Sequence, residues 1–460
     1  MSTPRTRKLF GTDGIRAVAG QYPLDAATIY AVGLALGHSL PKDGATAPKV
    51  ILGRDTRESG PWIAATLAAA LRQTGVEVAS AGVVPTPAVA FLTRTHGFAA
   101  GVVISASHNP WHDNGIKLFG ADGFKLPDAL ELAMEDEILH HAAEFERQGS
   151  EAPDPASLPA IEDNPALQAD YIQFLVDSVP GLKLNGLHIV ADCANGAAAA
   201  IAPQLFRRLG GSVELLHIAP DGRNINDACG ALHPKHVAAE TAARSAQIGL
   251  TFDGDADRCM LAGAHNNVIN GDAILLVAAR DLQARGLLTG DLVVATTMSN
   301  MGLEAALKRS GIKMLRAAVG DRYVLEEMLK NNAALGGEQS GHILLPHLAT
   351  TGDGLLTALV VLDLIARSGK TIDELTADLQ VFPQVIVNVK VRERIPLESI
   401  PPVAAAIRAA EEELQDSGRV VIRYSGTEPL ARVMIEAQCE ASMKHHASAI
   451  ADAIRAEVGA

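Results

Sequence analysis

AGVVISASHNP, residues 100–110, decides the fold class of this 460-residue chain. Its first half is a run of apolar and small residues typical of a buried strand, and its second half is a polar turn with two hydroxyls and an imidazole. Two later segments have the same design, QIGLTFDGDADR at residues 247–258 and AALGGEQSGH at residues 333–342. The sequence therefore predicts three buried strands, each of which ends in a polar loop.

Each segment closes a longer repeat of strand, helix, strand, helix and strand. The two earlier strands of the three repeats are, in order, KVILGRD (49–55) with VEVASAGVVP (76–85), LHIVADCANG (187–196) with SVELLHIAPDG (212–222), and DLVVATTMSN (291–300) with IKMLRAAVGDR (312–322). Buried strands that alternate with amphipathic helices are typical of parallel or mixed sheets with both faces covered. Ligands gather beyond the carboxyl ends of such strands, so three loops that face one cleft would form a single site.

The C-terminal part of the chain does not repeat this pattern. Apolar and polar residues alternate in QVIVNVKVRE (384–393), and a helical segment follows. Strand-like residues appear again in RVVIRYSGTEPLARVMIEAQ (419–438). This part of the sequence therefore predicts a smaller α+β domain. A linker with four prolines lies at residues 149–166. We therefore predict an α/β fold of three similar domains with mixed sheets, followed by the α+β domain. The predicted boundaries are 1–155, 156–253, 254–368 and 369–460.

Charge and aromatic content exclude nucleic acid as a partner. The chain has 39 basic and 53 acidic residues, a net charge of −14, whereas binding to a phosphate polymer draws on a cationic surface. Two Trp, five Tyr and ten Phe offer few rings for base stacking. We therefore expect no nucleic-acid partner.

Cysteine usage and hydropathy predict a cytoplasmic protein. The four cysteines form no C-x-x-C pair, which fits a reducing compartment better than a disulfide framework. The first residues lack the apolar segment of a secretory signal. The longest apolar run, LLTALVVLDLIA (355–366), is shorter than the roughly 18 residues that a membrane span needs. We therefore expect no membrane partner.

DGDADR (253–258) carries three carboxylates at alternate positions. This spacing places them on one side of an extended segment, where they would repel one another strongly without a cation. Oxygen ligands select a hard cation, Mg²⁺ or Ca²⁺. A calcium-binding helix-loop-helix hand is excluded, because its sixth and twelfth positions would be Arg258 and Ala264 instead of Gly and Glu. A solvated acidic turn is the alternative.

Two other loops have the chemistry of ligand-binding segments. RYSGTEPLAR (423–432) combines hydroxyls, a Gly turn and two arginines, which favours phosphate binding, although it is not a P-loop and a capped turn between strands is the alternative. GGEQSGH (336–342) offers a carboxylate, an amide, a hydroxyl and an imidazole, which suit the hydroxyls of a sugar. Taken alone, it also fits an ordinary polar loop.

The serines of SASHNP do not lie in the G-x-S-x-G elbow of an acyl-transfer nucleophile. A local Ser/Asn turn is one interpretation. Beside a metal loop and a phosphate-binding loop, a serine that carries a phosphoryl group is the better one. Phosphoserine adds about −1.5 to −2 charge, which a divalent cation would neutralise.

ISASHNP, DGDADR, GGEQSGH and RYSGTEP, with KLFGTDGIRA near the N-terminus, resemble the motifs of the α-D-phosphohexomutase superfamily. They come in the family's order, one to a domain, and span the chain. The resemblance implies four domains around a central cleft. Within the superfamily, FGTDGIR, VGDRYV (319–324) and Gln339 resemble the branch that acts on glucosamine phosphates, whereas the mannose and glucose phosphate branch more often has Met in that loop.

The resemblance also implies roles for individual residues. Ser107 would be phosphorylated, and Mg²⁺ would be held by a phosphate oxygen on Ser107 and by Asp253, Asp255 and Asp257. Residues that would bind the sugar hydroxyls are Glu338 and Ser340. Residues that would hold the non-reacting phosphate are Arg423, Ser425, Gly426, Thr427 and Arg432. Positions that line the family's reaction centre are Arg16, His108, Lys117, Arg258 and His342. Lys117 is the candidate general acid or base, with a solvated lysine as the alternative.

The implied reaction interconverts glucosamine 6-phosphate and glucosamine 1-phosphate, and its product would feed UDP-N-acetylglucosamine and cell-wall precursor synthesis. Phosphoserine gives its phosphoryl group to a bound hexosamine monophosphate, which becomes a 1,6-bisphosphate. This bisphosphate is both the intermediate and the activator, and it returns its other phosphoryl group to the serine. Because this intermediate must turn over without escaping, we expect the last domain to close over it. The alternatives are a mutase for mannose or glucose phosphates, a Mg²⁺-dependent phosphatase, and a non-catalytic phosphosugar-binding protein. The sequence leaves a homodimer open.

Overall fold

The computed structural model describes residues 8–11, 13–41, 47–148, 152–425 and 429–460. These residues form two compact units. One unit comprises the chain up to Met298 together with Ile312–Ala377, and the other comprises Ser299–Gly311 together with the chain from Asp378 onward. The loops predicted to carry the reaction centre lie in the first unit, and the loop predicted to bind phosphate lies in the second.

The first sheet has five strands in the order β1-β5-β4-β2-β3. Their bounds are β1 (Ile15–Val18), β2 (Lys49–Arg54), β3 (Glu77–Val83), β4 (Ala100–Ile104) and β5 (Asp113–Gly120). Strand β2 lies between β3 and β4 and is parallel to both. Strand β5 is antiparallel to β4, and β1 is antiparallel to β5. The sheet is therefore mixed.

The second and third sheets repeat this order, which confirms the predicted repeat and fold class. The second has the order β10-β9-β8-β6-β7, and the third has the order β12-β11-β13-β14. Their strands are β6 (His188–Asp192), β7 (Ser212–Leu216), β8 (Ile248–Phe252), β9 (Cys259–Ala262), β10 (Val268–Ile269), β11 (Leu292–Thr296), β12 (Lys313–Ala317), β13 (Leu335–Gly337) and β14 (Ile343–Leu344). In every repeat the first strand lies between the second and the third, and the fourth is antiparallel to the third.

The three polar loops occupy the same place in their repeats. Each joins the third strand to the antiparallel fourth strand, as SASHNP does between β4 and β5. DGDADR does so between β8 and β9, so the domain boundary predicted between residues 253 and 254 falls inside the second sheet. GEQSGH joins β13 to β14.

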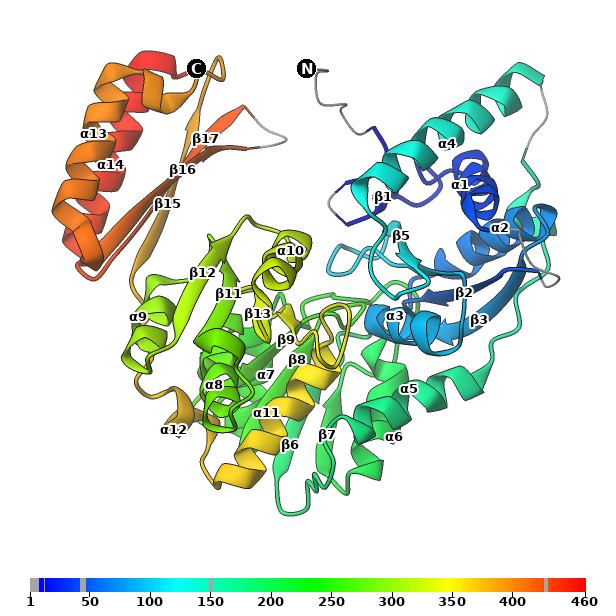
Figure 1. Ribbon diagram of the computed structural model, residues 1–460, viewed down its shortest axis with the longest axis horizontal. Coiled ribbons are helices and arrows are strands. Elements are labelled where there is room, and N and C mark those ends of the chain that lie inside the picture. The colour runs from blue at the N-terminus through cyan, green and yellow to red at the C-terminus, as the bar shows by residue number, and fades with distance from the viewer. Residues whose placement is uncertain (1–7, 12, 42–46, 149–151, 426–428) are drawn as a thin grey trace. The chain divides into compact units, whose positions relative to one another are not determined.

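Helices cover both faces of the first sheet (Figure 1). On one face are α1 (Ala26–Ser39), α2 (Gly60–Gln73) and α4 (Asp128–Gln148), which share one apolar core with the strands. On the other is α3 (Thr86–Thr95). The remaining helices of this unit are α5 (Pro165–Asp177), α6 (Ala198–Arg208), α7 (Pro234–Ala243), α8 (Gly271–Ala284), α10 (Asp321–Asn331), α11 (Gly354–Ser368), α12 (Ile372–Thr376), and the short 3₁₀ helices η1 (Pro155–Ser157) and η2 (Thr289–Asp291).

A glycine at the second position of each third strand lets a helix pack closely on the sheet. A Cβ atom at Gly101 would lie 2.2 Å from Thr93 Oγ1 of α3. One at Gly249 would lie 2.2 Å from Thr241 Oγ1 of α7, and one at Gly336 would lie 2.4 Å from the sulfur of Met328 in α10. Such distances are too short for a side chain, so the repeat extends to the packing of single residues.

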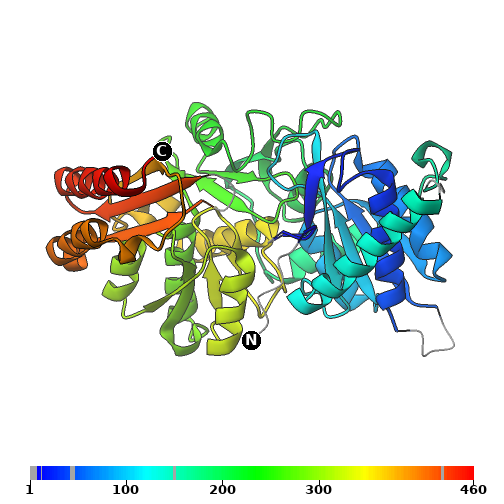
Figure 2. The same cartoon turned by 90° about the horizontal axis from the view of Figure 1, so that it is seen from above.

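The second unit is a three-stranded antiparallel sheet with two long helices on one face (Figures 1 and 2). Its strand order is β15-β17-β16. Its elements are α9 (Met301–Arg309), β15 (Gln384–Lys390), η3 (Leu397–Ser399), α13 (Pro401–Leu414), η4 (Gln415–Ser417), β16 (Gly418–Tyr424), β17 (Leu430–Ala437) and α14 (Glu440–Val458). Asn300 ties α9 to this sheet, because its side-chain amide donates to Glu436 Oε1 at 2.6 Å.

The longest apolar run of the sequence forms α11, a helix of 15 residues. Its Asp363 accepts a hydrogen bond from Arg367 Nε at 2.8 Å, so the helix has a polar side. Across the part of the chain that the structure describes, no helix has both the length and the apolar character needed to cross a bilayer.

Candidate active site

Ser107 lies at the centre of the site, directly after β4. It has a left-handed backbone conformation with a φ of 52° and is almost completely buried. Its hydroxyl donates a hydrogen bond of 2.5 Å to Asp253 Oδ2. A Cβ atom at Gly254 would lie 2.5 Å from the Ser107 carbonyl oxygen, so glycine is needed where the two loops meet. The fold thus joins the serine loop of the first repeat to the acidic loop of the second.

The three aspartates of the β8–β9 loop form one buried cluster. Carboxylate oxygens of Asp253, Asp255 and Asp257 all lie within 4.8 Å of one another. Burial, and then the two neighbouring carboxylates, raise the pKa of Asp253 well above its usual value. Buried Oδ1 atoms of Asp255 and Asp257 accept no hydrogen bond from the described residues. An oxygen-only donor set whose buried oxygens are not fully hydrogen-bonded fits a hard divalent cation.

Lys117 extends from β5 into the acidic cluster and is not a solvated lysine. It is 1 % exposed. Its Nζ donates to Asp255 Oδ2 at 2.7 Å and lies 3.0 Å from Asp13 Oδ2 and 3.6 Å from Asp257 Oδ2. Burial alone would lower its pKa, but Asp13, Asp255 and Asp257 outweigh that effect and raise it. The lysine is therefore a fixed positive charge among carboxylates.

His342 brings the loop of the third repeat to the acidic cluster. Its Nδ1 lies 3.6 Å from Asp257 Oδ1, and its Nε2 lies 3.6 Å from Asp321 Oδ2. Burial opposes the charged imidazolium, but Asp257 and Asp321 outweigh it and raise the pKa of His342 to about 9. The backbone N–H of Cys259 donates to the Gly341 carbonyl at 3.0 Å. The second and third loops are thus in direct contact.

Arg258 and Arg16 add positive charge around the serine, and His108 adds an imidazole that is neutral near pH 7. Arg258 Nε lies 3.8 Å from Asp257 Oδ1, and the Arg258 backbone N–H donates to Asp253 Oδ1 at 3.2 Å. Burial lowers the pKa of His108 to about 4, with further contributions from Arg258 and Arg16. Arg16 lies on β1, opposite Gly115 of β5. The structure therefore places all three near the reaction centre that the sequence predicted.

Glu338 and Ser340 are half-buried neighbours in the third loop. Ser340 Oγ donates to Glu338 Oε2 at 3.0 Å, and the Gly320 backbone N–H donates to Glu338 Oε1 at 3.1 Å. Gln339 points elsewhere, because its side-chain amide donates to Asp272 Oδ2 at 3.1 Å. A carboxylate and a hydroxyl that remain partly exposed beside a buried cluster can meet the hydroxyls of a sugar.

Arg423 and Arg432 lie side by side in the sheet of the second unit. They are paired residues of β16 and β17, and Ser425 Oγ lies 3.5 Å from Arg432 Nη2. Gly426 and Thr427 lie outside the described residues. Like charges directly across a ladder destabilise a sheet, and an anion bound between them reverses that effect.

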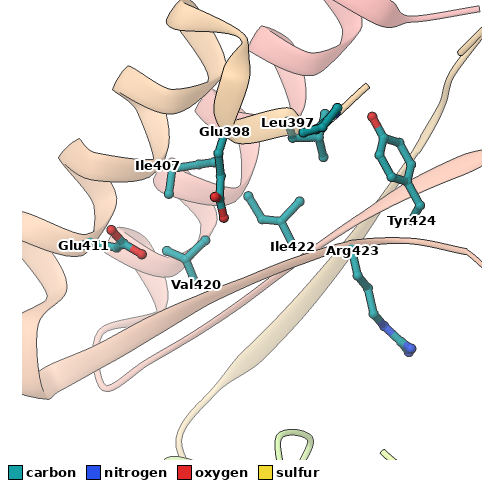
Figure 3. A pocket seen from close by; sticks show the side chains of 9 residues that line it. Leu397, Glu398, Ile407, Glu411, Val420, Ile422, Arg423 and Tyr424 are labelled. Carbon is teal, nitrogen blue, oxygen red and sulfur yellow. The ribbon is translucent and has the colours of Figure 1, made fainter. Parts of the chain in front are cut away.

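The opposite face of this sheet has a different character. A pocket of about 320 Å³ lies between the sheet and α13, lined by Ile422, Arg423, Tyr424 and the acidic residues Glu398 and Glu411. Figure 3 shows the Arg423 side chain pointing away from the other side chains, on the other side of the strand. The Arg423 guanidinium is therefore turned away from the two carboxylates of the pocket and can meet an anion on the other face.

Arg57 holds the serine loop in place and was not predicted. Its guanidinium is completely buried, pairs with Asp55 at 2.8 Å, and donates to the carbonyl oxygens of Ser107 and Asn109 at 2.9 and 2.8 Å. It also donates to the carbonyl of Pro110. The available signal was its place in GRDTR, just after a buried strand, where a charged residue needs a partner.

Asn226 and Ser105 complete this support. Asn226 Nδ2 donates to the Ser107 carbonyl at 2.9 Å. Ser105 Oγ accepts from the Ser107 backbone N–H at 2.9 Å and donates to Asp55 Oδ2 at 2.6 Å. Asn226 lies in a loop far from the serine in sequence, and no local pattern marks it. Both residues fix the backbone on which the Ser107 hydroxyl is presented.

Comparison with known proteins finds one family over nearly the whole chain. The four phosphoglucomutase/phosphomannomutase domain models match it: domain I at residues 7–144, domain II at 169–266, domain III at 270–382, and the C-terminal domain at 386–453. The phosphoglucosamine mutase of Koribacter versatilis is 58% identical over 456 residues, which cover 98% of each chain. That of Solibacter usitatus is 49% identical, over 98% of this chain and 99% of its own.

Solved structures share the fold. A phosphoglucomutase/phosphomannomutase family protein from Burkholderia thailandensis matches with a TM-score of 0.76 and 24% identity, covering 97% of each chain. The Aspergillus fumigatus N-acetylphosphoglucosamine mutase in complex with GlcNAc-6P and magnesium matches with a TM-score of 0.61 and 19% identity, covering 99% of this chain and 97% of its own.

Proposed function

The chain belongs to the phosphoglucomutase/phosphomannomutase family, and from this we propose that it is an isomerase that interconverts glucosamine 6-phosphate and glucosamine 1-phosphate. The reaction passes through a phosphorylated Ser107 and a hexosamine 1,6-bisphosphate. The observation that carries the proposal is the Ser107 hydroxyl, which lies 2.5 Å from a buried cluster of three carboxylates in a chain 58% identical to a phosphoglucosamine mutase. The protein works in the cytoplasm on a small phosphosugar.

The acidic cluster is the proposed site of a Mg²⁺ ion. Asp253, Asp255 and Asp257 would hold it together with a phosphate oxygen on Ser107, and the buried Asp255 Oδ1, which accepts no hydrogen bond from the described residues, supports this assignment. When bound, the ion offsets negative charge on the phosphoryl group during its transfer. The magnesium in the Aspergillus fumigatus enzyme accompanies a hexosamine phosphate, which is in keeping with the same use here.

The transfer step exchanges one P–O bond for another. The substrate hydroxyl attacks phosphorus and loses its proton, the bond from phosphorus to Ser107 Oγ breaks, and Oγ regains a proton. Lys117, the candidate general acid or base, is kept in its charged form by three carboxylates, so it acts first as a fixed positive charge beside the moving group. Arg16, His108, Arg258 and His342 surround the moving group and orient it.

The rest of the substrate is held at two places. Glu338 and Ser340 bind sugar hydroxyls. The phosphate that is not reacting binds to Arg423, Ser425, Gly426, Thr427 and Arg432, a role that the paired arginines of β16 and β17 support. Because the bisphosphate turns over between the two transfers, both ends of the sugar are treated alike.

The test is the mass of the intact protein before and after incubation with glucosamine 6-phosphate. We expect an adduct of one phosphoryl group on Ser107, and no adduct and no isomerisation in Ser107→Ala. Ser39→Ala is a matched control, because Ser39 is exposed and its hydroxyl donates to the Leu36 carbonyl of its own helix. Undiminished isomerisation by Ser107→Ala would refute the proposal.

Two parallel assays separate the alternatives. Turnover of glucosamine, glucose and mannose 6-phosphates under the same conditions distinguishes the three mutases, and we expect the amino sugar to be preferred. Release of inorganic phosphate distinguishes a phosphatase, and we expect almost none per isomerisation. A phosphosugar-binding protein without activity would show neither product nor labelled serine.

A further inference from the structure

A second set of metal-ligating side chains lies in the second repeat, separate from the acidic cluster. Asp192 is the last residue of β6, and His217 directly follows β7. Cys229 lies in the loop from β7 to α7, and His236 lies in the first turn of α7. Two imidazoles, a thiol and a carboxylate from four segments thus converge at the carboxyl end of one sheet.

Their distances are those of a preformed cluster. Ligating atoms of Asp192, His217 and Cys229 all lie within 4.8 Å of one another. His217 Nδ1 is 2.9 Å from Asp192 Oδ1, and His236 Nδ1 is 3.8 Å from Asp192 Oδ2. The two imidazole rings are 5.1 Å apart between centroids. Asp192, His217 and Cys229 would supply three ligands of a tetrahedral site, and His236, beside Asp192, is the candidate for the fourth.

We propose that Asp192, His217, Cys229 and His236 bind a zinc ion. Zinc takes thiolate, imidazole and carboxylate ligands in fourfold coordination, whereas Mg²⁺ takes oxygen. The proposed zinc site and the proposed Mg²⁺ site therefore differ in ligand chemistry.

Two features support a ligand at this cluster. His236 Nδ1 is buried and has no hydrogen-bond partner among the described residues. Ala194, His217 and Ala228, which surround the cluster, have left-handed backbone conformations with φ values of 54°, 50° and 51°. Such conformations in non-glycine residues persist where the surrounding structure fixes them, as at ligand sites.

The state of Cys229 agrees with this assignment. The Asp192 carboxylate is completely buried, and so is the Cys229 thiol. A bound Zn²⁺ would deprotonate it outright, so loading the site releases a proton.

The site would act on catalysis through Asn226. The loop that carries Cys229 also carries Asn226, whose backbone N–H donates to the Ala194 carbonyl at 2.9 Å and whose side chain holds the Ser107 carbonyl. Within the same loop, the Gly230 backbone N–H donates to Asp192 Oδ2 at 3.1 Å. Zinc bound here would fix this loop and with it a support of the serine. Its role is structural, and it leaves the phosphoryl transfer to the Mg²⁺ site.

Cobalt is the probe that distinguishes this site from the acidic cluster. Full-length protein is stripped of metal, saturated with Mg²⁺ and titrated with Co²⁺ under reducing conditions. We expect a thiolate-to-cobalt charge-transfer band in the near ultraviolet and tetrahedral bands in the visible, both complete at one equivalent and lost on addition of Zn²⁺. An all-oxygen site gives no charge-transfer band. Failure to see that band would overturn the proposal without touching the proposed reaction.

Variants assign the ligands. Cys229→Ser should lose the charge-transfer band. His236→Leu should weaken Co²⁺ binding at least tenfold. Because the His236 side chain is half-exposed, the His236→Leu protein should still fold. Cys439→Ser removes an exposed thiol and should leave the band intact. Zinc should raise the melting temperature of the wild-type protein and not that of either cluster variant. A band that survives Cys229→Ser, or wild-type affinity in His236→Leu, contradicts the assignment.

Discussion

The charge on Lys117 decides how strongly the acidic cluster attracts a cation. Its ammonium lies 2.7 Å from Asp255 and 3.6 Å from Asp257, where it competes with a metal for the same oxygens. Lys117→Met should therefore bind Mg²⁺ roughly tenfold more tightly, because removing one opposite charge at this range shifts such equilibria by one or more log units. Turnover should fall by about 10²-fold or more, because a fixed positive charge beside the moving phosphoryl group is lost.

Calorimetric titration of Mg²⁺ and steady-state kinetics measure these two effects. Lys117→Arg keeps the charge and is the matched control, with Mg²⁺ affinity near that of the wild type. Weaker Mg²⁺ binding in Lys117→Met would contradict this account of the lysine.

Arg57 is the second residue whose removal has a specific consequence. Lysine cannot reproduce a planar fork that pairs with Asp55 and reaches the carbonyls of Ser107 and Asn109 together. Arg57→Lys should lower the free energy of unfolding by about 1.5–3 kcal/mol, the range for lost hydrogen bonds to a charged group. It should slow phosphorylation of Ser107 more than it changes KM for the sugar phosphate.

Urea unfolding and the rate of phosphoserine formation check this. Arg72→Lys, on an exposed arginine in the last turn of α2, serves as the control and should change neither. An Arg57→Lys variant with normal phosphorylation kinetics would show that the guanidinium only stabilises the fold.

Sequence reasoning found the groups that meet at the site and missed those that hold them. Ser107, Asp253 and His342 could be placed together because each follows the third strand of a repeat. Arg57 and Asn226 donate hydrogen bonds to backbone carbonyl oxygens of the serine loop. Every residue has a backbone carbonyl, so the side chains of that loop do not indicate which residues will bond to it.

Helix α11 begins on a buried carboxyl group that makes stability depend on pH. Asp353 caps the helix, accepting from the Leu356 backbone N–H at 2.9 Å and from the Tyr171 hydroxyl at 2.8 Å. Burial raises its pKa from 3.8 to about 6. The folded protein therefore holds this proton more tightly than the unfolded chain does. The resulting stabilisation is complete below about pH 4 and is lost as the pH rises through 6.

Asp353→Asn removes this titration and keeps the cap, because Asn and Asp cap helices equally well. Above pH 6 we expect the variant to be more stable than the wild type by up to about 3 kcal/mol, the equivalent of the pKa shift, and the difference should shrink toward pH 4. Urea unfolding in Mg²⁺-free buffer across this range measures it. A difference that grows as the pH falls would have the wrong sign.

At the scale of elements, the repeat was predictable and its last strands were not. Three buried strands per repeat stood out because each is a continuous apolar run. Strands β10 and β14 have two residues each, and β9 has four, too few for any periodicity to show. The boundary expected at residue 253 consequently fell before strands that belong to the second sheet.

The proposed reaction requires one ligand to contact residues of both units. A hexose 1,6-bisphosphate has a phosphate at each end, and the proposed contacts for these ends lie in different units, at Ser107 and at Arg423 with Arg432. A ligand that binds both shifts the population toward conformations in which both ends are held. Glucose 1,6-bisphosphate should therefore lower the radius of gyration of the full chain in small-angle scattering.

Arg423→Ala tests whether the arginine face is responsible. Losing a charged hydrogen bond costs about 1.5–3 kcal/mol, so the bisphosphate should bind more than tenfold more weakly, and the compaction should disappear at ligand concentrations that saturate the wild type. Arg408→Ala is the matched control, because Arg408 is an exposed arginine of the same unit on α13, which packs against the other face of the sheet. Compaction that persists in Arg423→Ala would move the phosphate contact elsewhere. If the radius of gyration of the wild type does not change at saturation, the bisphosphate is held by one unit alone. The loops around Ser107 would then have to retain the bisphosphate between the two transfers.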